Sequence, residues 1–150
     1  MRDMFLVMLT SATPVSELRG GIPLGVALGL EPVLVYVLAV TANMAIFWPG
    51  RLALVWFYEA VFRKLPYFDH YLLSVRRRGE PKVRKYGVLA LIVFVAIPLP
   101  ITGAYTGTVL SWLLAMDWLR SFVAISIGVV CAGVIVMLAT MGVVSIATVP

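Results

Sequence analysis

Residues 16–23 hold the side chains best suited to do chemistry in this chain. They read SELRGGIP and place an acid and a base, Glu17 and Arg19, two residues apart between apolar segments. Charged side chains inside an apolar environment are costly and are usually kept where they bind or carry something. This stretch is therefore the first candidate for a substrate or ion site.

The backbone of this stretch can add to the two charges. We expect Gly20 and Gly21 to leave backbone N–H groups accessible, and Pro23 suits the first turn of a helix. The positive end of that helix and Arg19 would together form a cradle for an anion. Glu17 could instead hold a proton or attract a cation. The two charges could also simply pair and hold the break together.

A second polar break, residues 96–107, has no charge but carries hydroxyl groups. Pro98 and Pro100 leave carbonyl groups without an N–H partner, and Thr102 and Tyr105 supply hydroxyl oxygens. These oxygens could coordinate a cation or line a path. They could equally cap the adjoining helices.

The composition indicates that both breaks lie in a membrane. Hydrophobic residues make up 62% of the chain and charged residues 13%, against about 45–50% and about 25% in globular domains. This balance excludes a disordered tail, a nucleic-acid-binding domain and an ordinary soluble enzyme. The sequence predicts an all-α integral membrane protein, with one membrane domain over residues 1–150.

Only two segments are long enough to cross a bilayer, which takes about 20 apolar residues. They are residues 33–57 and 118–149. The apolar arms on either side of each break are too short to cross separately. We expect each pair of arms to enter the membrane and return as a re-entrant hairpin. A single proline-kinked crossing is the alternative.

Small residues recur at similar places in the two halves. The two ladders are Gly21, Gly25 and Gly29 after the first break, and Gly103, Gly107 and Ser111 after the second. Small residues four apart let another helix approach closely. The match predicts an inverted repeat of a re-entrant hairpin plus a transmembrane helix, with residues 1–58 and 87–150 as the two repeats.

A basic band joins the predicted repeats. Eight of the 12 Lys and Arg residues lie within residues 59–86. Because short basic loops stay in the cytoplasm, this band predicts a cytoplasmic linker and hairpins that open to opposite sides. Apolar spacing between Tyr67 and Val75 predicts an amphipathic interfacial helix in the linker. A solvated loop is the alternative.

Two polar residues inside the first predicted span are secondary candidates. Asn43 could form a hydrogen bond across helices. Arg51 could extend to the membrane interface or reach the cavity between the hairpins. The chain's single His and single Cys cannot form a metal cluster, and no phosphate loop or nucleophile–base set is present. We therefore expect no metal, no cofactor and no enzymatic activity.

The segments SELRGGIPLG (16–25) and FVAIPLPITGAYTG (94–107) resemble the small multi-drug export protein family of archaea and bacteria. That family is similar in turn to the DedA/VTT superfamily, which implies two re-entrant hairpins in inverted repeat and ion-coupled movement of lipid carriers or phospholipids. The chain departs from the DedA pattern at Ile97 and Ile101, where DedA proteins carry arginines. The resemblance implies functional roles for Glu17, Arg19, Pro98, Pro100, Thr102 and Gly103.

These observations predict an ion-coupled secondary transporter of a small amphipathic substrate, with protons or sodium as the coupling ion. The substrate would meet Glu17, Arg19 and residues 102–105. It would be a lipid-like anion, such as a polyprenyl phosphate or phospholipid, or a drug-like cation. A non-transporting membrane scaffold and a gradient-independent lipid scramblase are the alternatives. We expect a homodimer in the plasma membrane of a prokaryote, with membrane lipid and no nucleic acid as partners.

Overall fold

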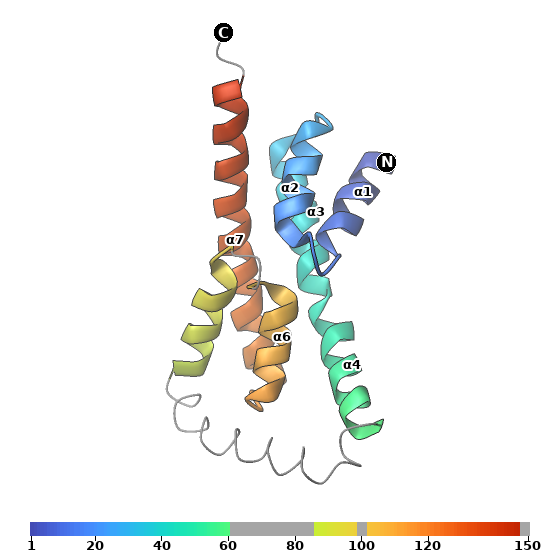
Figure 1. The fold of residues 1–150 in the computed structure, drawn as a ribbon, viewed down its shortest axis with the longest axis vertical. Coiled ribbons are helices and arrows are strands. Elements are labelled where there is room, and N and C mark those ends of the chain that lie inside the picture. Colours follow the sequence, from blue (N-terminus) through green and yellow to red (C-terminus); the bar gives the residue numbers. More distant parts are fainter. Residues whose placement is uncertain (61–85, 99–101, 148–150) are drawn as a thin grey trace.

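A computed structural model of the chain describes residues 1–60, 86–98 and 102–147, and these residues form helices and connections without strands (Figure 1). The helices are α1 (Arg2–Ser11), α2 (Glu17–Ala27), α3 (Pro32–Ala45), α4 (Phe47–Ala60), the helix Tyr86–Ala96, α6 (Ala104–Leu113) and α7 (Trp118–Ala147). The predicted all-α class is confirmed for this part of the chain. The predicted linker helix and Pro100 lie outside the described residues.

The first two helices form a hairpin that packs on α3. Pro14 follows α1 closely and cannot continue its hydrogen bonding, so the chain turns there. Contact with both neighbours requires a glycine in α2. A Cβ atom on Gly25 would lie 2.6 Å from a methyl group of Val35 in α3 and 3.0 Å from one of Val7 in α1. The absence of a side chain there lets all three helices meet.

Helices α2 and α6 end in the same way. The residues after them, Gly29 and Ala115, have positive φ angles of 75° and 54°. The N–H group of the following residue donates to the carbonyl of Gly25 at 3.2 Å in one case and of Ser111 at 2.9 Å in the other. This turn satisfies carbonyl groups that the end of a helix leaves without partners.

The two longest helical segments also begin in the same way. Glu31 precedes α3 and Asp117 precedes α7, and each carboxylate accepts two backbone N–H groups from the first turn at 2.9–3.2 Å. Such a cap stabilises a helix start by about 1 kcal/mol. When the two halves are aligned on these shared turns and caps, Gly25 corresponds to Ser111. The small-residue ladders in the sequence paired it with Gly107, one helical turn away.

Within the described residues, two helical segments are long and apolar enough to cross a membrane, Pro32–Tyr58 and Trp118–Ile146. They match the two segments that the sequence predicts to be long enough to cross a bilayer. The first is not continuous, because α3 ends at Ala45 and α4 begins at Phe47. Pro49 has no N–H group to donate to the carbonyl of Ala45, which accounts for the break.

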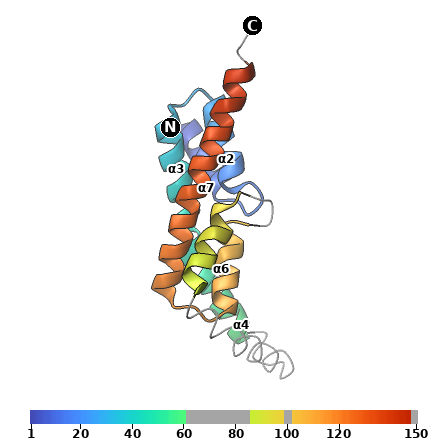
Figure 2. The same cartoon turned by 90° about the vertical axis from the view of Figure 1, so that its left-hand side faces the viewer.

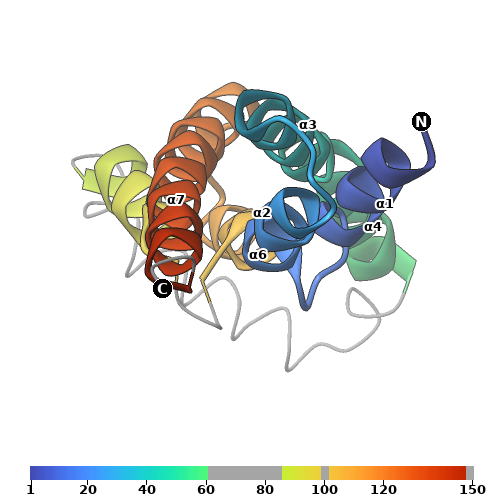
Figure 3. The same cartoon turned by 90° about the horizontal axis from the view of Figure 1, so that it is seen from above.

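Helix α7 is the longest helix of the described residues, and a helix of each hairpin packs against it. Figures 1 and 2 show α2 and α3 beside its C-terminal half, with the helix Tyr86–Ala96 and α6 beside its N-terminal half, while α1 packs on the far side of α2 and α3. Seen from above, α2 lies between α7 and α1, and α6 lies beneath α2 (Figure 3). Gly133 of α7 allows a close approach of Tyr36 and Val40 from α3, and Gly128 allows that of Val95.

Arg51 is buried, with 4% of its surface exposed, and it joins α4 to the turn between α6 and α7. It donates to the hydroxyl of Ser111 and to the carbonyl of Met116, both at 2.8 Å. Its guanidinium carbon also lies 5.5 Å from the ring centre of Trp118, a cation–π contact. The side chain therefore neither extends to an interface nor lines the space between the hairpins.

Replacing Arg51 with Leu should lower the free energy of unfolding by about 2 kcal/mol, because the buried carbonyl of Met116 loses a charged donor. Chemical denaturation in detergent, followed by tryptophan fluorescence, measures the change. Arg120→Leu is the matched control, since Arg120 is exposed in the first turn of α7. Equal midpoints for the Arg51 variant and the wild type would contradict this structural role.

Candidate functional site

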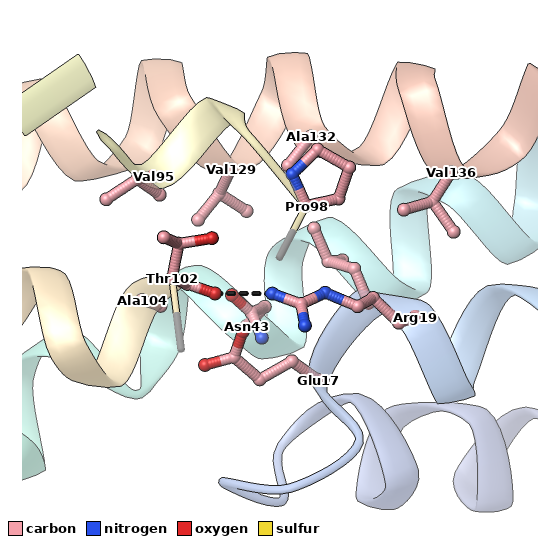
Figure 4. Close-up of a pocket in the computed structure, with 12 residues that line it drawn as sticks. Glu17, Arg19, Asn43, Val95, Pro98, Thr102, Ala104, Val129, Ala132 and Val136 are labelled. Carbon is pink, nitrogen blue, oxygen red and sulfur yellow. Dashed lines mark hydrogen bonds between the residues drawn. The ribbon is translucent and has the colours of Figure 1, made fainter. Parts of the chain in front are cut away.

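The breaks of the two hairpins meet beside the middle of α7 and enclose a small cavity, which we call the central cavity (Figure 4). Its polar lining comes from Glu17 and Arg19 of the first hairpin, Asn43 of α3 and Thr102 of the second hairpin. Its apolar wall is formed by Val129, Ala132 and Val136 of α7 together with Val95 and Pro98. The cavity volume is about 10 Å³, which is room for about one water molecule.

Glu17 is held in an unusual backbone conformation at the start of α2. Its φ angle is 46°, in the left-handed region that costs a residue with a side chain about 1–3 kcal/mol. The carboxylate lies at the N-terminus of α6 and accepts the N–H group of Tyr105 at 3.4 Å. A helix N-terminus favours negative charge because its N–H groups point outward. The acid of one hairpin therefore caps a helix of the other.

Gly103 is required for this contact. A Cβ atom at this position would collide with the carboxylate of Glu17. The glycine that the sequence pattern placed in a ladder of small residues thus serves a different purpose in the structure. It lets the Glu17 side chain reach the first turn of α6.

Arg19 also crosses to the second hairpin. Its guanidinium donates to the carbonyl of Thr102 at 2.5 Å, the bond drawn in Figure 4. The direct Glu17–Arg19 pair considered from the sequence does not form. Within the described part of the chain, the ion pair within 4.0 Å joins Arg2 and Asp3. Both central charges therefore hold the opposite hairpin rather than each other.

Three further hydrogen bonds fix the two breaks. The hydroxyl of Tyr105 donates to the carbonyl of Ala12 at 2.5 Å, which ties α6 to the first break. The hydroxyl of Thr102 donates to the carbonyl of Ile97 within the second break. The buried amide of Asn43 donates to the carbonyl of Ser11 at 2.9 Å, so α3 holds the end of α1. The tips are therefore connected through backbone carbonyls as well as charges.

The predicted anion cradle at Gly20 and Gly21 is wrong in its details. The second arm begins at Glu17, so Pro23 lies inside α2 rather than at its start. The N–H group of Gly20 donates to the carbonyl of Ser16 at 3.0 Å and is not available to a ligand. A Cβ atom on Gly21 would collide with the hydroxyl of Ser11. Both glycines serve packing between α1 and α2.

The predicted site residues thus fall into two groups. Glu17, Arg19, Asn43, Pro98, Thr102 and Gly103 line the central cavity, whereas Gly20, Gly21, Pro23, Arg51 and Tyr105 do not. Sequence reasoning missed the wall that α7 contributes. That helix is apolar around its whole circumference, so no periodicity shows which of its faces meets the hairpins. Gly128 and Gly133, where other helices approach α7 closely, lie on either side of Val129 and Ala132 in this wall, and those two glycines were the available signal.

Residues 17–135, which run from the start of α2 through the second break and into α7, match the model of a family described as "Putative small multi-drug export protein". No curated protein and no solved structure gave a significant match. The family match spans well over half of the chain and agrees with the two long apolar helices in indicating a membrane protein. The chain therefore belongs to this family of small multi-drug export proteins.

Proposed function

We propose that the protein is an ion-coupled secondary transporter of a small amphipathic substrate, and that its two hairpins are re-entrant and form an inverted repeat. The observation that carries the proposal is the meeting of the two hairpin tips. There, Glu17 and Arg19 of one hairpin bind the backbone of the other. Paired backbone breaks in two halves are typical of transporter substrate sites.

The lengths of the arms support re-entrant hairpins. Helices α1, α2 and α6 have 10, 11 and 10 residues, or about 15 Å each at 1.5 Å per residue. That is about half of the 30 Å hydrocarbon layer. Broken backbone at this depth is tolerated where protein surrounds it. Here α3 and α7 pack beside both breaks.

The matching helix ends support the inverted repeat. The same turn and the same acidic cap join α2 to α3 and α6 to α7. The two hairpins nevertheless point in opposite directions along α7 (Figure 2). A relation to the DedA/VTT superfamily would imply this same architecture. It would also suggest a lipid-carrier substrate such as a polyprenyl phosphate.

The size of the central cavity implies that the hairpins separate during transport. At about 10 Å³ it cannot hold a drug-sized molecule, since sites for such ligands are usually 300–1,000 Å³. Passage requires the contacts of Arg19 with Thr102 and of Tyr105 with Ala12 to open. Protonation of Glu17 would remove the charge that α6 stabilises, and this links opening to a proton gradient. Sodium is the alternative coupling ion.

The cellular setting completes the proposal. The transporter would lie in the plasma membrane of a prokaryote as a homodimer, with residues 59–86 in the cytoplasm because of their basic charge. Its partners would be membrane lipid, the coupling ion and the substrate. It would need no cofactor and would catalyse no chemical step.

Cysteine labelling tests the re-entrant arrangement. In a Cys131→Ala background, Asp3→Cys and Leu28→Cys should both react with a membrane-impermeant maleimide from the same side. Leu119→Cys should react from the opposite side. The reason is that α1 and α2 enter and return, whereas α3 and α4 together cross the membrane. If Asp3→Cys and Leu28→Cys react from opposite sides, the first hairpin is a single kinked crossing.

Proton flux tests the coupling. Purified protein in liposomes with an imposed pH gradient should acidify or alkalinise the lumen when a lipophilic cation or a polyprenyl phosphate is added. Glu17→Gln should reduce this substrate-driven flux at least about tenfold, equivalent to about 1.4 kcal/mol, because glutamine cannot take up and release a proton. Glutamine can still accept the N–H group of Tyr105, so the fold should persist.

The matched control for the flux assay is Glu31→Gln, which changes an exposed acid at the start of α3. It should leave flux unchanged. Full coupled transport by the Glu17 variant would refute a role for its proton. Substrate movement that ignores the gradient would indicate a scramblase. Folded protein that moves no substrate would favour a membrane scaffold.

A further inference from the structure

An apolar groove between α2 and α7 extends away from the hairpin tips, and we call it the α2–α7 groove. Its volume is about 480 Å³, within the range of sites that bind small molecules. Its walls include Val26 and Ala27 of α2 and Ile135, Ala139, Val143 and Val144 of α7. The α7 wall is about 13 Å long at 1.5 Å per residue. The groove therefore has the size and character to hold an alkyl chain.

The inner end of the groove carries a positive charge. Arg19 is the charged residue among those that line it, and Glu17 does not reach it. Thr140 is polar, but its hydroxyl donates to the carbonyl of Val136 at 2.8 Å. Within the described residues, no carboxylate lies within 4.0 Å of the Arg19 guanidinium. An apolar groove that ends at such a cation is complementary to an amphiphile with an anionic head group.

The groove is continuous with the site already described. Arg19, Pro98 and Val136 line both the groove and the central cavity. A head group bound by Arg19 would therefore sit at the hairpin tips, while its chain lay along α7. A lipophilic cation in the same place would face the positive charge of Arg19. The positive charge of Arg19 therefore favours an anionic substrate over a cationic one, the two charge classes that the sequence left open.

A second apolar groove, between α4 and α6, provides the contrast. It measures about 380 Å³ and is lined by Gly50, Ala53 and Phe57 of α4 and by Tyr105, Thr108 and Val109 of α6, among others. No charged residue occurs among the described residues of its lining. It resembles the α2–α7 groove in size and apolar character but lacks the cation. It can therefore serve as an internal control.

We propose that the α2–α7 groove binds the apolar chain of a single-chain anionic amphiphile drawn from the bilayer, with its head group on Arg19. This inference deepens the proposed transport function and depends on it for its physiological meaning. Binding itself does not require transport. The site can therefore be tested separately from the transport cycle.

The test measures equilibrium binding of radiolabelled dodecyl phosphate to the full chain in nanodiscs of neutral lipid, with empty nanodiscs subtracted. Arg19→Gln should weaken binding at least about tenfold, because a charged hydrogen bond is lost. Arg19→Lys should restore part of the affinity. Unlabelled dodecyltrimethylammonium, with the same chain and a cationic head group, should not compete. Inorganic phosphate alone should bind much more weakly than dodecyl phosphate.

Two tryptophan substitutions test the place of the chain. Ala139→Trp fills the α2–α7 groove and should reduce dodecyl phosphate binding at least about tenfold, since it removes the space for the apolar chain. Ala53→Trp places the same side chain in the α4–α6 groove and should leave binding unchanged. Both alanines are exposed positions on long helices, so neither change should disturb the core.

Three results would overturn the inference: dodecyl phosphate binding that is independent of Arg19, equal competition by the cation, or equal effects of the two tryptophans. The result also separates this inference from the proposed function. Specific binding without gradient-driven flux would retain the anion site and reject transport. Gradient-driven flux of a lipophilic cation without dodecyl phosphate binding would retain transport and reject the anion site.

Discussion

The structure depends on two charged side chains of the first hairpin, both of which bind the second hairpin. Glu17 caps α6, and Arg19 donates to the carbonyl of Thr102. Charges in an apolar interior are costly unless hydrogen bonds compensate them. The second break and the start of α6 supply that compensation from backbone groups that they leave available. The second hairpin therefore provides the partners that make the charges of the first tolerable, and the first break in turn provides the carbonyl of Ala12 to the hydroxyl of Tyr105.

This arrangement requires close packing around it. The carboxylate of Glu17 reaches α6 only because Gly103 has no side chain. Helix α3 comes close to α7 at Gly133, and Val95 comes close to α7 at Gly128. Lipid tails are as apolar as the side chains of a helix, so the hydrophobic effect does not drive helices together in a membrane. They associate through such close contacts instead. The glycines therefore determine how near the tips come, and the charges determine what holds them there.

Much of the architecture could be predicted from the sequence, because its causes are local. Composition gives the membrane class, and proline and glycine clusters mark the two breaks. The predictions failed where the local structure depends on a residue that is distant in the sequence. The start of α2 at Glu17 depends on α6, and the burial of Arg51 depends on a hydroxyl and a carbonyl group that lie 60 and 65 residues away in the chain. The wall that α7 contributes to the central cavity has no periodic signal at all.

In the proposed transporter, the contacts of Glu17 and Arg19 with the second hairpin would also couple binding to opening. A ligand anion on Arg19 would compete with the carbonyl of Thr102, and a proton on Glu17 would weaken its contact with the N-terminus of α6. Each event would favour the proposed state in which the tips are apart, so each would also favour the other by thermodynamic linkage. If Glu17 and Arg19 had paired with each other, neither ligand nor proton would affect the contact between the hairpins. Because Glu17 and Arg19 bind the second hairpin separately, the contact between the hairpins would respond both to a ligand and to a proton.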